Sequence, residues 1–111
     1  MKVFKTKISK LDLEELAKTY GDMIKGVVDI GQKMAALGGE LHADCEEVLL
    51  EQGCKQADLW GFNIYPNKKT EERLEYTSFI NIRPKQGNFQ MEVKDEKIRR
   101  QIKAVVDHLI D

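Results

Sequence analysis

Apolar residues recur at helical spacing in three stretches of the chain. The strongest pattern covers 95–110, where apolar side chains repeat every three or four residues over four turns. They are Ile98, Ile102, Val105, Val106, Leu109 and Ile110. Ser9 and Asp95 stand as N-cap residues before two of the stretches, and Gly21 ends the first. The pattern predicts helices over 9–20, 44–52 and 95–110.

The helix over 44–52 carries its own start signal. Asp44 is followed three residues later by Glu47, a variant of the capping box, which makes Asp44 the predicted N-cap. Gly53 follows the last residue of the pattern and is expected to close the helix.

Alternating apolar and polar positions predict a β-hairpin in the second half of the chain. Over 59–65 and over 76–83, apolar residues occupy every second position, which is the period of a strand with one buried face. We expect the two strands to pair antiparallel with Phe62 opposite Ile82. Their apolar faces would then meet the helices.

The segment 23–41 allows two interpretations. Its β-branched residues favour two strands, 24–31 and 34–40, joined near Gln32 and Lys33; the alternative is a helix through 33–37. Each glycine inside a helix costs about 1 kcal/mol. We prefer the strands because glycines interrupt every helical window, namely Gly26, Gly31, Gly38 and Gly39.

The predicted elements follow the order α-β-β-α-β-β-α. Strands joined by short connections pair antiparallel, so the fold class is α+β, a mainly antiparallel sheet with helices packed on one face. With 111 residues, the chain has the length of one domain, 1–111. Residues 1–8 precede the first helix as an N-terminal extension or an edge strand.

Composition and charge narrow the class of protein further. Hydrophobic residues make up 41% and charged residues 33%, enough for both a core and solubility. No apolar stretch approaches the ~20 residues of a membrane span, and the N-terminus lacks an apolar signal segment. We therefore expect a cytoplasmic protein with no membrane contact. The net charge of −1 does not favour nucleic-acid binding, although basic clusters occur within 2–10 and 97–103.

Cys45 and Cys54 are predicted to be free thiols. A helix between them would separate their Cα atoms by about 13 Å, at 1.5 Å per residue. A disulfide requires a separation below about 7 Å. Two free thiols suit a reducing compartment.

The polar face of the predicted hairpin is the first candidate site. The register that buries Phe62 places Gly61 opposite Arg83 and Asn63 opposite Asn81, with Phe79 on the same face. An arginine beside two carboxamides suits a planar anion or an amide-bearing ligand. The alternative is a structural role, in which Arg83 pairs with an acidic neighbour such as Glu40 or Asp44.

His42 and Asp44 form the second candidate pair. In an extended segment they would point the same way, with the imidazole as a base or ligand and the carboxylate orienting it. A metal site would need a third ligand, which Cys45, Cys54, Asp29 or His108 could supply. No spacing demands one, so we expect no metal and no cofactor.

Three motifs resemble a known family. They are GGELHAD at 38–44, DLWGFNIYP at 58–66 and INIRPKQGN at 80–88, followed by KDEKIRRQI. Together they are similar to a family of short prokaryotic proteins classed only as a domain of unknown function, from about Asp22 to the C-terminus. The resemblance implies one domain and no mechanism. Asn88, in the third motif, joins the candidate ligand-binding residues His42, Asp44, Asn63, Asn81 and Arg83.

The sequence leaves three functions open. The first is binding of a small molecule or anion, with or without weak hydrolase or transferase activity in which Arg83 holds an anion and His42 acts as base. The second is a structural or regulatory protein-interaction module, as a homodimer. The third is an RNA-interacting domain. Convergence of His42, Asn63, Asn81 and Arg83 in one cavity would favour the first function, whereas their dispersal would favour the second.

Overall fold

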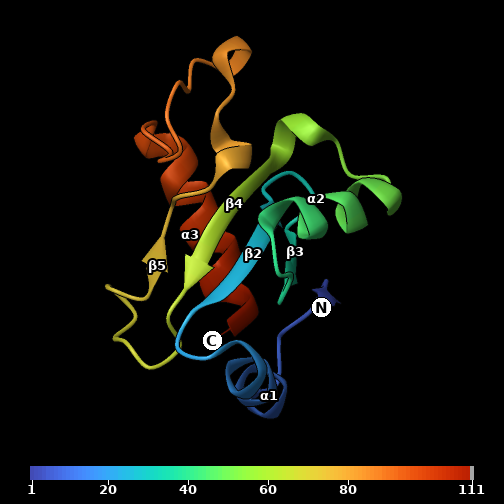
Figure 1. Cartoon of the computed structure of the whole chain (residues 1–111). Coiled ribbons are helices and arrows are strands. Elements are labelled where there is room, and N and C mark those ends of the chain that lie inside the picture. The colour runs from blue at the N-terminus through green and yellow to red at the C-terminus, as the bar shows by residue number, and fades with distance from the viewer. Residues whose placement is uncertain (111) are drawn as a thin grey trace.

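A five-stranded antiparallel sheet forms the centre of the molecule (Figure 1). The computed structural model describes residues 1–110. Across the sheet the strands are β1 (Lys2–Phe4), β3 (Met34–Leu37), β2 (Ile24–Asp29), β4 (Leu59–Ile64) and β5 (Leu74–Glu75). The helices are α1 (Lys10–Tyr20), α2 (His42–Glu51) and α3 (Glu96–Ile110), with short 3-10 helices at Gln56–Asp58, Phe79–Asn81 and Pro84–Gln86. The predicted α+β class is confirmed, and the N-terminal segment contributes an edge strand.

The segment after α1 forms two strands, as predicted. At the turn between β2 and β3, the Asp29 carboxylate accepts hydrogen bonds from the backbone of Gly31 (2.8 Å) and Gln32 (2.9 Å). Gly26 lies where a Cβ atom would come within 2.5 Å of the Leu37 side chain and 2.6 Å of Phe62. This glycine therefore permits close packing inside the sheet instead of ending an element.

The sheet is covered on both faces. α1 and α3 pack on one face, where the larger core includes Val28, Trp60 and Ile102. α2 packs on the other face, where its Leu49 joins Val27 of β2 in the smaller core. Figure 1 shows α3 and α2 on opposite sides of the sheet. The helices thus occupy two faces where one was expected, because adjacent residues of β2 are buried in opposite directions.

The helix starts agree with the sequence at two of three positions. Ser9 caps α1 by accepting a hydrogen bond from the Asp12 backbone (3.0 Å), and Asp95 accepts one from Lys97 (2.8 Å). The predicted N-cap of α2 is wrong. Leu41 occupies that position, and Asp44 lies in the first turn, where its carboxylate accepts a hydrogen bond from the Leu41 backbone (3.2 Å).

The predicted strand over 76–83 is also wrong. Strand β5 contains only two residues, which pair with Asn63 and Ile64 of β4. Beyond it, the Ser78 hydroxyl accepts a hydrogen bond from the Ile80 backbone (3.2 Å) and starts a 3-10 turn that ends extended pairing. The register that placed Phe62 opposite Ile82, Gly61 opposite Arg83 and Asn63 opposite Asn81 therefore does not form.

None of the helices formed by residues 1–110 is long and apolar enough to cross a membrane.

Candidate functional site

Asn81 closes the open edge of β4 with its side chain. Its carboxamide oxygen accepts a hydrogen bond from the Gly61 N–H (2.8 Å), and its nitrogen donates one to the Gly61 carbonyl (2.9 Å). Asn81 is fully buried. A Cβ atom on Gly61 would lie 2.5 Å from the Ser78 Cβ atom. Only glycine at position 61 therefore lets the segment around Ser78 approach β4 this closely. Asn81 thus replaces the hydrogen bonds of a neighbouring strand.

Asn88 holds the next stretch of chain in place. Its side-chain nitrogen donates to the carbonyls of Asn81 and Gln90, each at 2.8 Å. Its oxygen accepts a hydrogen bond from the Lys94 backbone (3.1 Å). The segment between β5 and α3 is therefore ordered by buried carboxamides together with two isolated antiparallel bridges, at Thr77–Glu92 and Arg83–Asn88.

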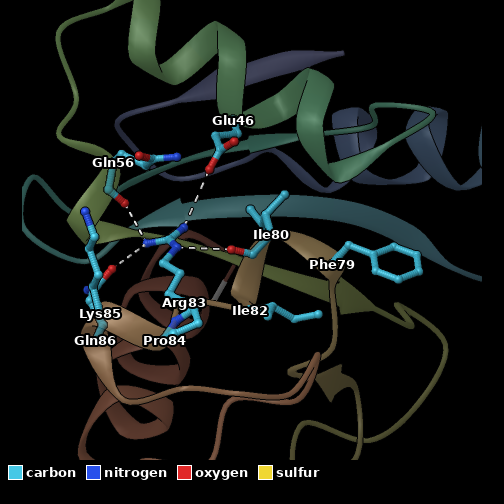
Figure 2. Close-up of a pocket in the computed structure, with 9 residues that line it drawn as sticks. All are labelled: Glu46, Gln56, Phe79, Ile80, Ile82, Arg83, Pro84, Lys85 and Gln86. Carbon is cyan, nitrogen blue, oxygen red and sulfur yellow. Dashed lines mark hydrogen bonds and ion pairs between the residues drawn. The ribbon is translucent and has the colours of Figure 1, made fainter.

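The Arg83 side chain binds three parts of the chain, namely α2, the stretch 56–59 and its own segment 80–86 (Figure 2). Its nitrogens contact the carbonyls of Ile80 (3.0 Å), Gln56 (2.6 Å) and Leu59, the Gln86 amide oxygen (3.3 Å) and the Glu46 carboxylate (3.5 Å). The side chain is 10% exposed, and burial lowers the pKa of Arg83 while Glu46 opposes that shift. All three guanidinium nitrogens already have protein partners, so a ligand anion would have to displace them.

His42 ends a chain of hydrogen bonds that begins at Glu75. The Asn63 side-chain nitrogen donates to the Glu75 carboxylate (2.7 Å), which can only accept. The Asn63 oxygen therefore faces His42 Nε2 (2.8 Å), which also lies 3.0 Å from the Phe62 carbonyl. With two acceptors beside it, Nε2 must carry the proton.

The imidazole of His42 is neutral near pH 7. Burial lowers the pKa of His42, and the nearby Lys25 ammonium lowers it further. The hydrogen bonds to Phe62 and Asn63, and the Glu75 charge, act in the opposite direction. Nδ1 is consequently an unprotonated acceptor, and no hydrogen bond to it forms within residues 1–110.

The six candidate residues fall into separate groups. His42 and Asn63 contact each other, and Asn81 contacts Asn88. The Arg83 backbone pairs with Asn88, while the Arg83 side chain binds Leu59 at the other end of β4. Asp44 serves the first turn of α2. The six do not share one cavity, because Arg83 lines one cavity and His42 another.

Two surface cavities lie between α2 and the segment 78–86. The larger, about 450 Å³, is lined by Glu46, Gln56, Phe79, Ile80, Ile82, Arg83, Pro84, Lys85 and Gln86. The smaller, about 230 Å³, is lined by Lys25, Leu41, His42, Ala43, Ser78, Phe79 and Ile80. Phe79 and Ile80 form part of both walls. Figure 2 shows the Phe79 ring projecting away from the Arg83 guanidinium.

Apolar side chains are exposed around these cavities. Phe79 is 76% exposed, Leu41 60% and Ile82 42%. We call Leu41, Phe79, Ile80 and Ile82 the Phe79 surface. The sequence pattern did not predict this surface, although it held one signal: in the predicted hairpin, Phe79 fell on the polar face. Glu46, Gln56 and Glu75 were missed too, since each meets its partner only through the tertiary fold.

The basic cluster of α3 is partly neutralised. Arg99 lies 3.3 Å from the Glu92 carboxylate and stacks on the Tyr76 ring at 4.4 Å. Lys103 lies 2.6 Å from Asp107. These ion pairs reduce the positive charge that an RNA backbone would meet.

Both cysteines are free and buried, as the helix between them predicts. Burial raises the pKa of the Cys45 thiol, and burial with the Asp29 carboxylate raises that of Cys54 to about 12. Both are therefore protonated and unreactive at neutral pH. Within residues 1–110, no three His, Cys, Asp or Glu side chains are arranged to hold a metal ion.

The fold defines a small α+β domain in which an irregular segment is fixed against one sheet edge. The chain belongs to the family described as protein of unknown function (DUF5674), whose model matches residues 2–109. The match begins well before Asp22, so β1 and α1 are part of the family's domain as well. No curated protein and no solved structure matches the chain.

Proposed function

We propose that this domain is a protein-interaction module that binds its partner through the Phe79 surface. The observation that carries the proposal is the exposure of Phe79 between two cavities. Large apolar side chains grouped on a surface mark interaction sites, and buried aromatic anchors supply much of the energy of an interface.

The surroundings of Phe79 support a preformed site. Ser78, on one side, is buried and starts the 3-10 turn, and Asn81, on the other, is bonded to Gly61. The aromatic ring is thus presented from a rigid backbone. A rigid anchor loses little conformational entropy on binding, which favours affinity.

Binding of a small molecule or anion draws less support from the geometry. The polar groups of four candidate residues already form hydrogen bonds within the protein. These residues are Asn63, Asn81, Asn88 and Arg83. The same holds for a hydrolase or transferase, because Arg83 and His42 do not face a common cavity.

The test uses a random dodecapeptide phage library selected on the immobilised domain. Enriched peptides are synthesised and titrated by fluorescence anisotropy against the wild type, Phe79→Ser and Phe89→Ser. Phe89 is a matched control, since it also lies between β5 and α3 and is 71% exposed but lines neither cavity. We expect Phe79→Ser to weaken binding about tenfold or more and Phe89→Ser to leave it unchanged. No enrichment, or equal affinity for Phe79→Ser, would contradict the proposal.

A further inference from the structure

The cavities beside the Phe79 surface are lined by more basic than acidic side chains. Four charged side chains line its two cavities: Lys25, Glu46, Arg83 and Lys85. Three are basic and one is acidic, which leaves a net charge of +2. Glu46 and Arg83 pair with each other at 3.5 Å, so the excess belongs to the two lysines.

The two lysines are divided between the cavities. Lys25 lines the smaller cavity and Lys85 the larger, with Phe79 and Ile80 between them. The Lys25 ammonium donates a hydrogen bond to the backbone carbonyl of Glu40 (3.0 Å). This carbonyl is uncharged, so the bond does not neutralise the lysine. In the part of the chain that the structure describes, neither lysine forms an ion pair with a carboxylate. His42, being neutral, adds no charge to the smaller cavity.

We infer that the partner is an acidic peptide segment in which apolar side chains are flanked by carboxylates. The apolar side chains would pack against Phe79 and fill the cavities, and the carboxylates would meet Lys25 and Lys85. Complementary charges at the edge of an interface select the partner and speed association. This inference rests on the proposed function and specifies the partner's chemistry.

A second copy of the chain fits this surface less well. In a symmetric dimer the same patch appears on both sides of the interface. Lys25 and Lys85 of one copy would then approach those of the other, and like charges brought together at an interface are unfavourable. An acidic partner removes this repulsion.

The experiment uses the peptides enriched by the phage library. Their net charge is determined, and their affinities are measured in 50 and 300 mM NaCl for the wild type, the double variant Lys25→Gln/Lys85→Gln and the control Lys69→Gln. Lys69 lines neither cavity. Sedimentation equilibrium of the wild type and Phe79→Ser tests self-association.

We expect enriched peptides that combine acidic with aliphatic or aromatic residues. The double variant should bind about threefold more weakly or worse in low salt and lose much of the salt dependence, whereas Lys69→Gln should match the wild type. Peptides that need Phe79 but are neutral or basic, or that bind the double variant equally well, would overturn the inference and leave the proposed function standing. A dimer that Phe79→Ser dissociates would instead assign the surface to a second copy and overturn the inference.

Discussion

Two asparagine side chains, those of Asn81 and Asn88, satisfy backbone groups in the second half of the chain. Asn81 supplies both hydrogen bonds that Gly61 would make to a neighbouring strand, and Asn88 binds the segment that follows. Residue type alone suggested a polar site for these positions. Their structural role became visible only in the fold, because the atoms they serve lie up to 20 residues away in sequence.

Asn81→Ala should destabilise the domain strongly. The change leaves the buried N–H and C=O groups of Gly61 without partners, and each such group costs about 1–3 kcal/mol. We expect the free energy of unfolding to fall by about 2–4 kcal/mol in urea denaturation. Asn67→Ala, at an exposed loop position, is the matched control and should change it by less than about 0.5 kcal/mol. Equal midpoints for both variants would contradict the role of Asn81.

His42 should titrate below the ordinary histidine value of about 6.5. Its folded-state pKa is lowered, so the unfolded chain binds the proton first as pH falls. The stability that neutral His42 provides is therefore complete above about pH 6.5 and is lost as pH falls through the folded pKa. Glu75→Gln should lower the pKa of His42 further, because the Glu75 carboxylate favours the imidazolium.

NMR titration of the His42 ring measures this pKa directly. The nitrogen shifts should also show the Nε2–H tautomer near pH 7. Lys25 and Glu75 are the charged groups that act on the ring, and Lys25→Gln should move the pKa upward. A wild-type midpoint above the ordinary value of about 6.5 would contradict burial as the dominant influence on the His42 pKa. An Nδ1–H tautomer would contradict the hydrogen-bond chain.

At the scale of elements, local patterns correctly predicted the three helices and three of the four expected strands, whereas the strand expected over 76–83 was wrong. The N-cap residues Ser9 and Asp95 bond to backbone groups two or three residues away. Such helix starts can therefore be recognised from the sequence. The alternation over 76–83 was misleading, since Ser78 starts a 3-10 turn and Asn81 binds Gly61 from the side. The contact between Asn81 and Gly61 joins residues 20 apart in sequence, so periodicity could not reveal it. The ligand-binding role expected for the six candidate residues stays a prediction. The common face expected for Asn63, Asn81 and Arg83 depended on a strand register that does not form.

The apolar face of α3 should contribute strongly to the stability of the domain. Ile102 is fully buried in the larger core, so Ile102→Ala leaves a cavity there. We expect a loss of about 2–5 kcal/mol in the free energy of unfolding. Gln101→Ala, on the exposed side of the same helix, should have little effect. A thermal or urea midpoint that Ile102→Ala leaves in place would show that α3 is not packed as described.

The whole molecule consists of a sheet buried on both faces and an irregular segment, 78–86, that exposes Phe79. α2 and the segment 78–86 come together because both pack against β4, on the face away from α3. The two cavities form at this junction. All residues of β4 are buried, a continuous pattern that is typical of a strand covered on two sides. Only the complete arrangement places Leu41 near Phe79.

Backbone chemical-shift mapping with an enriched peptide tests the interaction surface most directly. The amide signals of 41–46 and 78–86 should move as peptide is added to the wild type, because these segments line the two cavities. The same titration of Phe79→Ser should produce no comparable changes, whereas Phe89→Ser should reproduce the wild-type pattern. Shifts confined to α3 and residues 70–76, or shifts that persist unchanged in Phe79→Ser, would contradict binding at the Phe79 surface.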